Sequence, residues 1–159
     1  MKIFVDTNIF LDLILKREKF HDALLIFNAI EKKLFEGIIL DITILNIDYI
    51  AKKQVKNIKD FIKLINSSFS IVGISNEMIS KALEIENNDF EDTLQYLSAK
   101  SADCEYVITN DKSFYKADIK TLSSSKFIEK YLENPNFELP KVPQQEQEQV
   151  RRQDELVRG

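Results

Sequence analysis

Met1-Lys2-Ile3-Phe4-Val5-Asp6-Thr7-Asn8 is the stretch that decides the fold. Its apolar run, residues 3–5, is typical of a central strand of a parallel sheet, which is buried on both faces. An acid, a hydroxyl and an amide end the run, and an amphipathic pattern begins at once with Ile9 and Phe10. The stretch therefore predicts a strand, a tight turn and a helix, with Asp6 at the carboxyl end of the strand.

Asp6 has two interpretations at that position. Functional side chains gather at the carboxyl ends of strands in open α/β sheets. The carboxylate is therefore a candidate ligand for a cation or for a metal bound to phosphate. Alternatively, Asp6 only caps the helix that follows it.

Length and composition indicate a single globular domain. The chain has 159 residues, of which 44% are hydrophobic and 30% charged, and its formal net charge is −4. That charge neither advertises nucleic-acid binding nor excludes it, because a bound divalent metal would invert the local field. The one cysteine, Cys104, allows no internal disulfide and fits a reducing cytoplasm. No apolar run approaches the length of a membrane span, so we expect a cytoplasmic protein with no membrane segment.

Strand-like and helix-like segments alternate along the whole chain. After the first strand we expect further strands at residues 38–40, 71–74, 106–108 and 119–122. The expected helices cover residues 9–16, 20–34, 43–69, 76–86 and 123–132, with Gly37 ending the second and Asn57 marking a point where the third can break. One more helix opens at Asp89 and carries Leu94 and Leu97 as buried positions. This alternation predicts an α/β fold with three layers, α/β/α, and a central parallel sheet of four to five strands.

The segment from Pro135 onward differs in composition from the rest. It contains the prolines of the chain and the polar run Gln144-Gln145-Glu146-Gln147-Glu148-Gln149. Such a segment has too few apolar residues to form a core of its own. We expect a domain at 1–134 and a polar tail at 135–159 that is disordered, marginally helical or ordered by a partner.

Four lysines form a candidate surface for nucleic acid. They recur at intervals of four, three and four residues and would line one face of the helix 43–69 if it is continuous: Lys52, Lys56, Lys59 and Lys63. Such a stripe can follow a nucleic-acid backbone, although a solvated charged face is the commoner explanation. The single histidine, His21, has no ligand-type residue at ligand spacing except Asp22, so histidine acid–base catalysis is not expected.

Carboxylates stand at equivalent ends of several predicted elements. Asp6 ends the first strand, Asp111 follows strand 106–108, and Asp89 and Asp92 share one face at the start of a helix. If the strand order reverses at the first strand, the carboxyl ends of these two strands flank one crevice. Crowded carboxylates raise one another's pKa unless a cation joins them, and hard oxygen donors select Mg²⁺ or Mn²⁺ over zinc. We therefore predict a Mg²⁺ or Mn²⁺ site here, although each acid alone can be a cap or a solvated charge.

Three motifs in this order resemble the PIN domain, the fold of VapC-type toxin ribonucleases and related nucleases. Asp6-Thr7-Asn8 is similar to the opening motif of that family. Phe90-Glu91-Asp92-Thr93-Leu94-Gln95-Tyr96 is similar to its acidic helix, and Val107-Ile108-Thr109-Asn110-Asp111-Lys112-Ser113-Phe114 to its closing motif. The resemblance covers roughly residues 1–133. It implies a metal-dependent endonuclease with RNA as substrate, a homodimer, and an antitoxin protein as partner.

The resemblance also implies roles for the site residues. Asp6, Asp92 and Asp111 would be catalytic and would hold one or two Mg²⁺ or Mn²⁺ ions, with Asp89 beside them as a further ligand. The metal would lower the pKa of a bound water and stabilise charge on the phosphate. The polar residues expected to orient a carboxylate or a phosphate oxygen are Thr7, Asn8, Asn110 and Ser113.

One position departs from the PIN pattern. The family usually has a glutamate three residues after a threonine in the helix that follows the second strand, and here Asn46 follows Thr43 at that spacing. Asn46 offers a neutral oxygen at the edge of the site but lacks the negative charge. Asp41 is a better substitute than Asp48, because positions two apart do not share a helix face. We expect retained activity with weaker metal binding; the alternative is a degenerate PIN domain that binds RNA or protein without cleavage.

Overall fold

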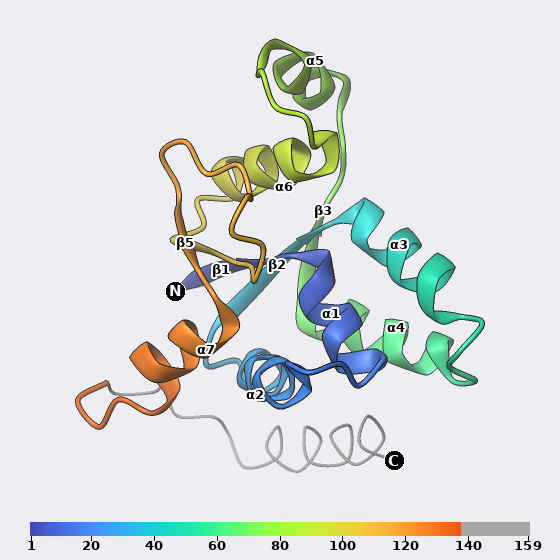
Figure 1. Ribbon diagram of the computed structural model, residues 1–159, viewed down its shortest axis with the longest axis vertical. Coiled ribbons are helices and arrows are strands. Elements are labelled where there is room, and N and C mark those ends of the chain that lie inside the picture. Colours follow the sequence, from blue (N-terminus) through green and yellow to red (C-terminus); the bar gives the residue numbers. More distant parts are fainter. Residues whose placement is uncertain (138–159) are drawn as a thin grey trace.

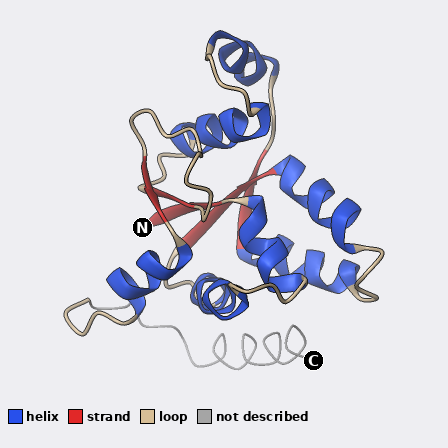
Figure 2. Ribbon diagram, in the orientation of Figure 1, coloured by secondary structure: helices blue, strands red, loops and turns tan. Residues whose placement is uncertain are grey.

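The computed structural model describes residues 1–137, which form one parallel sheet with helices on both faces (Figures 1 and 2). The central strand is β1 (Lys2–Val5), which pairs with β2 (Glu36–Leu40) on one side and β4 (Tyr106–Ile108) on the other. Beyond these lie β3 (Phe69–Val72) and β5 (Lys120–Leu122), giving the order β3-β2-β1-β4-β5 with every pair parallel. The predicted α/β class is confirmed, and the strand order reverses at β1, which leaves a crevice at its carboxyl end.

Each face of the sheet is covered by its own set of helices. One face packs against α1 (Thr7–Ile14), α2 (Phe20–Glu31), α3 (Asp41–Ala51), α4 (Ile58–Ser68), α7 (Ser124–Phe127) and the wider π turn Ile128–Leu132. The other packs against α5 (Asn76–Glu84) and α6 (Phe90–Ser101). Alternate residues of β1 serve the two faces: Ile3 and Val5 belong to the first core cluster and Phe4 to the second.

The sequence predicted that Gly37 ends the second helix, and this prediction is wrong. The helix ends at Glu31, and Gly37 lies inside β2 with its backbone close against the core. A Cβ atom at Gly37 would stand 2.6 Å from Cδ2 of Phe69 and 2.9 Å from Cγ2 of Ile30. The glycine is therefore required by the close approach of two side chains, and the third strand begins earlier than predicted because Phe69 fills this space.

The predicted helix 43–69 is interrupted close to the break that Asn57 suggested, so the condition for a stripe of four lysines on one helix face is not met. Ala51 ends α3 and Ile58 begins α4, so Lys52 and Lys56 lie in the connection between them. Lys59 and Lys63 remain one turn apart on α4, where Lys63 lies 3.8 Å from the carboxylate of Asp60. The four lysines are therefore divided between the connection and α4.

The described chain ends against the core. Phe137 stacks on Phe35 at 6.1 Å between ring centroids and makes an edge contact with Tyr131 at 5.0 Å. Residues 138–159, which make up most of the predicted polar tail, lie outside the described residues. Among residues 1–137, every helix is too short or too polar to cross a membrane.

Candidate active site

Asp6 stands at the carboxyl end of β1 with only 2% of its surface exposed. Thr109 Oγ1 donates to its Oδ2 over 2.9 Å, and Gln95 Nε2 donates to its Oδ1 over 3.1 Å. Burial raises the pKa of Asp6, and these two hydrogen bonds oppose the rise. Asp6 is also the N-cap residue of α1, and a hydrogen bond with the backbone of Asn8 lowers its pKa, so a capping part stands beside its contacts with Thr109 and Gln95.

The first turn of α6 brings two more acids to this edge. Asp89 is the N-cap of the helix, and its Oδ1 accepts the backbone N–H of Asp92 over 3.0 Å. Asp92 is 8% exposed. Burial raises the pKa of Asp92 to about 7, and the negative charges of Asp89, Asp6, Asp111 and Glu91 contribute in that order. The carboxylates at the ends of β1 and β4 and at the start of α6 therefore act on one another.

Asp111 follows β4 and is exposed at the rim of the crevice. Ser113 holds its Oδ1 with two hydrogen bonds, from the backbone N–H over 2.9 Å and from the hydroxyl over 2.7 Å. The backbone N–H of Asp111 in turn donates to Thr109 Oγ1 over 3.1 Å. Because the same hydroxyl donates to Asp6, Thr109 links the two acids directly.

Two asparagines of the predicted site lie differently from expectation. Asn110 exchanges hydrogen bonds with Ser124: its Nδ2 donates to Ser124 Oγ over 3.0 Å and its Oδ1 accepts the Ser124 backbone N–H over 2.9 Å. It also bonds to Asp12 on α1, so it joins β4, α7 and α1. The Asn8 side chain is exposed on the first turn of α1. The structure thus gives Asn110 a structural part and leaves Asn8 open to solvent.

The sequence analysis missed Glu91, which lies among the polar residues of this edge. Its Oε1 accepts hydrogen bonds from Asn46 Nδ2 over 2.9 Å and from Thr7 Oγ1 over 3.3 Å. Thr7 Oγ1 also lies 2.9 Å from Thr43 Oγ1. Asp41, the expected substitute for the missing acid, instead accepts the Ile74 backbone N–H over 3.1 Å at the end of β3.

A sequence signal for this part of the site does exist. Glu91 and Gln95 are one turn apart on α6 and share a face, and both reach residues of β1 or α1. The spacing of Asp89 and Asp92 and the resemblance to the acidic helix both drew attention to this segment, and Asp92 was taken as its functional residue.

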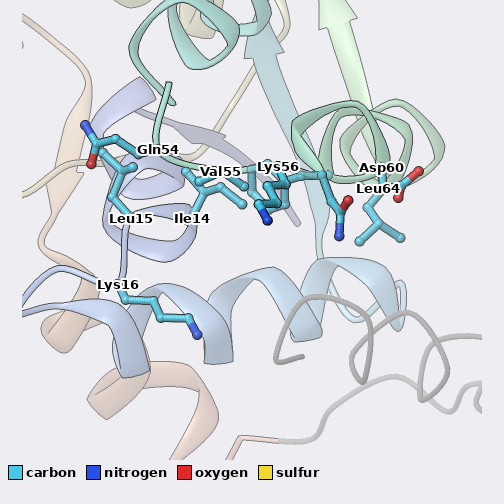
Figure 3. Close-up of a pocket in the computed structure, with 10 residues that line it drawn as sticks. Ile14, Leu15, Lys16, Gln54, Val55, Lys56, Asp60 and Leu64 are labelled. Atoms are coloured by element: carbon cyan, nitrogen blue, oxygen red, sulfur yellow. The ribbon is translucent and has the colours of Figure 1, made fainter. Parts of the chain in front are cut away.

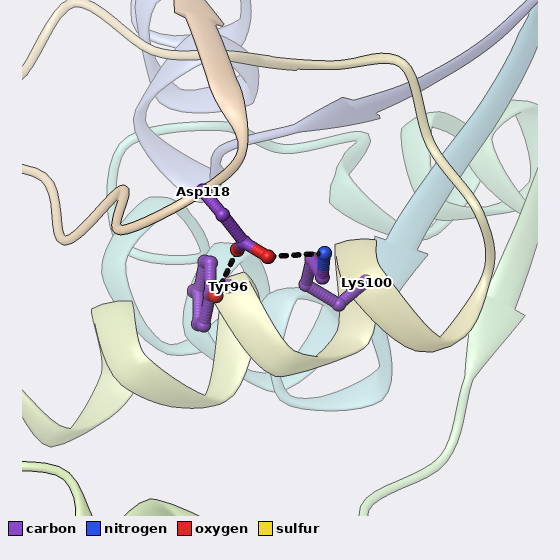
Figure 4. Close-up of polar contacts among 3 residues, drawn as sticks. All are labelled: Tyr96, Lys100 and Asp118. Atoms are coloured by element: carbon purple, nitrogen blue, oxygen red, sulfur yellow. Dashed lines mark hydrogen bonds and ion pairs between the residues drawn. The ribbon is translucent and has the colours of Figure 1, made fainter.

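A second contact fixes the loop that carries Asp111 (Figure 4). Asp118, at the end of this loop, accepts hydrogen bonds from the Tyr96 hydroxyl and from Lys100 Nζ, the latter over 2.7 Å. Tyr96 and Lys100 are one turn apart on α6. The loop 109–119 is thereby joined to α6 at its far end and to Asp6 at its near end.

Two cavities lie in different parts of the molecule. One of about 220 Å³ adjoins Asp111 and includes Lys112 and Lys116 in its wall. A larger one of about 390 Å³ lies at the opposite end of α1, between Ile14 and the connection that holds Val55 and Lys56 (Figure 3). Eight helical residues separate the two ends of α1, about 12 Å. The larger cavity therefore does not belong to the edge of the sheet at which Asp6, Asp92 and Asp111 lie.

The donor chemistry of this edge suits a hard divalent cation. Its side chains offer carboxylate, amide and hydroxyl oxygens, and the mutual repulsion of the carboxylates would be relieved by a cation. In residues 1–137, no three histidine, cysteine, aspartate or glutamate side chains form a ready-made metal cluster. Mg²⁺ commonly takes only one or two carboxylates directly and keeps several waters, so the residues present fit such an ion.

Comparison with known proteins gives consistent relatives. A family model described as "PIN domain" matches residues 2–113. Ribonuclease VapC1 of Aquifex aeolicus is 28% identical over 141 residues, which cover 82% of this chain and 95% of that protein. The crystal structure of VapBC2 from Rickettsia felis bound to a DNA fragment from their promoter matches with a TM-score of 0.56 and 17% identity, covering 77% of this chain and 98% of that chain. At that identity the structural likeness speaks for the fold.

Proposed function

The chain belongs to the PIN domain family, and from that premise we propose that it is a metal-dependent endoribonuclease that hydrolyses RNA phosphodiester bonds. The observation that carries the proposal is the convergence of Asp6, Asp92 and Asp111, whose charges act on one another at the carboxyl edge of the sheet. The similarity to Ribonuclease VapC1, which spans nearly the whole of that protein, supports RNA as the substrate.

We propose Mg²⁺ or Mn²⁺ as cofactor, held by Asp6, Asp92 and Asp111. When bound, such an ion lowers the pKa of a coordinated water and stabilises negative charge on the phosphate. Thr109 and Gln95 fix the Asp6 carboxylate, and so the protein orients this ligand before the ion arrives. The Asp89 carboxylate caps α6 and adds negative charge around the ligands.

The cavity beside Asp111 is the proposed path of the RNA backbone. Lys112 and Lys116 border it, and Thr109 and Asn110 add polar atoms to its wall. Lysine ammonium groups next to an acidic metal site can hold the phosphates that flank the scissile bond. This position replaces the lysine stripe that the sequence suggested.

The degenerate alternative rests on Asn46, the position where the family usually has an acid. Its amide donates to Glu91, so a carboxylate still occupies this corner of the site. That contact favours the enzymatic function over a binding module without cleavage.

The test is cleavage of single-stranded RNA with Mn²⁺ or with EDTA. We expect cleavage by the wild type that requires the metal, and loss of cleavage in Asp6→Asn and Asp111→Asn. Equal cleavage by the wild type and both variants would end the nuclease assignment. Metal-independent binding of RNA without cleavage would support the degenerate alternative.

We further propose that the protein acts as the toxin of a toxin–antitoxin pair and forms a homodimer in the cytoplasm. The antitoxin partner follows from the likeness to a VapBC complex and to a VapC ribonuclease. A cytoplasmic location fits the RNA substrate and the free cysteine, Cys104. Co-expression with the product of the neighbouring reading frame should restore growth that the protein alone arrests.

A further inference from the structure

The side chain of Asn46 points toward the side chain of Glu91 and is hydrogen-bonded to it. Asn46 lies on the second turn of α3 and Glu91 on the first turn of α6, and Nδ2 of the former is 2.9 Å from Oε1 of the latter. Thr7, the first residue of α1, donates to the same Oε1 over 3.3 Å. Three helices thus converge on one carboxylate oxygen.

The hydrogen bonds leave the other oxygen of Glu91 available. Oε1 accepts both bonds from its neighbours, while within residues 1–137 no donor is recorded for Oε2. Glu91 is only partly buried, so its side chain is not sealed from solvent. A carboxylate fixed at one oxygen and free at the other is arranged as a metal ligand with an outer partner.

Asn46 and Glu91 form a matched pair. The amide of Asn46 supplies N–H donors to a carboxylate acceptor, and this direction of the bond follows from the acceptor being an acid. A glutamate at position 46 would place a second carboxylate against Glu91 and repel it. The asparagine is therefore compatible with an acid at position 91 in a way that a glutamate is not.

The charge of Glu91 also reaches the other acids. It acts on the carboxylate of Asp6 and on that of Asp92, its neighbour in sequence. Although Glu91 was not among the predicted site residues, its negative charge raises the pKa of both Asp6 and Asp92. Glu91 therefore belongs to the same electrostatic unit as the proposed ligands.

We propose that Glu91 gives the bound divalent cation the carboxylate that position 46 does not supply, and that Asn46 is a positioning residue that holds it. This inference rests on the proposed metal-dependent function. Oε2 acts on the ion directly or through a water, since Mg²⁺ and Mn²⁺ sites of this kind retain waters. The carboxylate that the family usually carries on α3 is thus supplied by α6 in this chain.

The experiment measures Mn²⁺ binding by isothermal titration calorimetry and the Mn²⁺-induced rise in Tm over EDTA. The proteins are full-length wild type, Glu91→Gln, the exchanged pair Asn46→Glu/Glu91→Gln, and Asp6→Asn. The matched control is Glu84→Gln, which makes the same change at an exposed residue at the end of α5. Glutamine keeps the size of Glu91 and an acceptor for Asn46, and a Tm in EDTA no lower than that of the wild type shows that the variant folds.

We expect Glu91→Gln to bind Mn²⁺ about tenfold more weakly and to lose most of the Mn²⁺-induced rise in Tm, because ligand charge sets affinity in oxygen sites. The exchanged pair should regain most of the lost affinity, since positions 46 and 91 touch. Glu84→Gln should match the wild type.

The outcomes separate this inference from the proposed function. If Glu91→Gln binds Mn²⁺ like the wild type while Asp6→Asn does not, Glu91 is no ligand and the metal-dependent function stands. If Glu91→Gln loses affinity and the exchanged pair does not regain it, position 91 does not substitute for position 46 and the inference is overturned. If Asp6→Asn binds Mn²⁺ as the wild type does, or if the wild type does not bind Mn²⁺, the proposed metal-dependent function is contradicted, and the inference about Glu91 falls with it.

Discussion

Thr109 donates its hydroxyl hydrogen to Asp6 over 2.9 Å, and the same oxygen accepts the backbone N–H of Asp111 over 3.1 Å. Thr109 is 5% exposed, so both bonds lie away from competing water. One hydroxyl thereby sets the position of a carboxylate on β1 relative to the loop after β4. Thr109 therefore links Asp6 and Asp111, two acids that lie far apart in the sequence.

Thr109→Val should raise the pH that the enzyme needs. The Thr109 hydrogen bond lowers the pKa of Asp6, so its removal raises that pKa, and Asp6 must be ionised to hold a metal. We expect the acid limb of the pH profile of RNA cleavage to move to higher pH. Thr109→Ser keeps the hydroxyl and should keep the wild-type profile; an unmoved limb in the valine variant would show that this bond does not tune Asp6.

Asp6→Asn should make the metal-free protein more stable. Burial and the charge of Glu91 both raise the pKa of Asp6, so its ionised form destabilises the metal-free fold. Removing that charge should raise Tm in EDTA by a few degrees and abolish any rise with Mn²⁺. Thermal melts of both proteins with EDTA and with Mn²⁺ provide the measurement, and a lower Tm of the variant in EDTA would contradict the argument.

Asp92 should make the metal-free protein less stable as the pH rises. The unfolded chain loses the Asp92 proton near the ordinary aspartate pKa of 3.8, whereas the folded chain keeps it up to a pKa of about 7. Between these two values the folded state binds more protons than the unfolded state. The contribution of Asp92 to the free energy of unfolding therefore falls with rising pH and is lost above neutrality. Melts in EDTA from pH 5 to pH 8 should show a decline that is much smaller in Asp92→Asn; parallel curves would mean that Asp92 titrates normally.

Gly37→Ala should destabilise the fold. The added methyl group would meet the Phe69 ring and Ile30, and the ring is itself packed 5.0 Å from Phe10, centroid to centroid. Overpacking of this kind costs about 1–3 kcal/mol. Gly73→Ala is the matched control, because its Cβ would meet only Asp41 Oδ2 at 3.8 Å. Chemical denaturation of both variants should separate them clearly, and equal stability would show that the sheet relaxes around Gly37.

Truncation after Phe137 should leave the domain intact. Phe137 packs against Phe35 and Tyr131 and so completes the core cluster on that face. From their sequence, residues 138–159 supply few apolar side chains, and we expect Tm to change by less than about 2 °C when they are removed. Phe137→Ala should lower Tm in either length of chain, and a large loss on truncation alone would show that the tail binds the domain.

The sequence predicted those features that depend on local pattern. Asp6 and Asp111 were found because apolar runs end at them, and such runs report strand ends directly. Asp92 was found because it shares the first turn of a predicted helix with Asp89, and the PIN-like motif supported it. The interrupted helix after β2 was foreseen only as an option, because the apolar period continues across residues 52–57 while the chain turns.

The features that the sequence did not predict depend on contacts between distant segments. Gly37 was taken as a helix end because a glycine commonly stops a helix, whereas its place is set by Phe69 on the neighbouring strand. Glu91 was passed over because nothing near it in sequence shows that Asn46 and Thr7 lie against it. Pairing of this kind appears only once α1, α3 and α6 have packed together.

The central position of β1 has a consequence for a chain that is still being made. Asp6 directly follows β1, but its partners Gln95 and Thr109 are translated only some 89 and 103 residues later, and the second acid Asp111 comes after them. Until β4 has emerged and paired with β1, the nascent chain has neither the crevice nor its full set of acids. The proposed site is therefore complete only when segments about a hundred residues apart in the sequence have both been made and have paired.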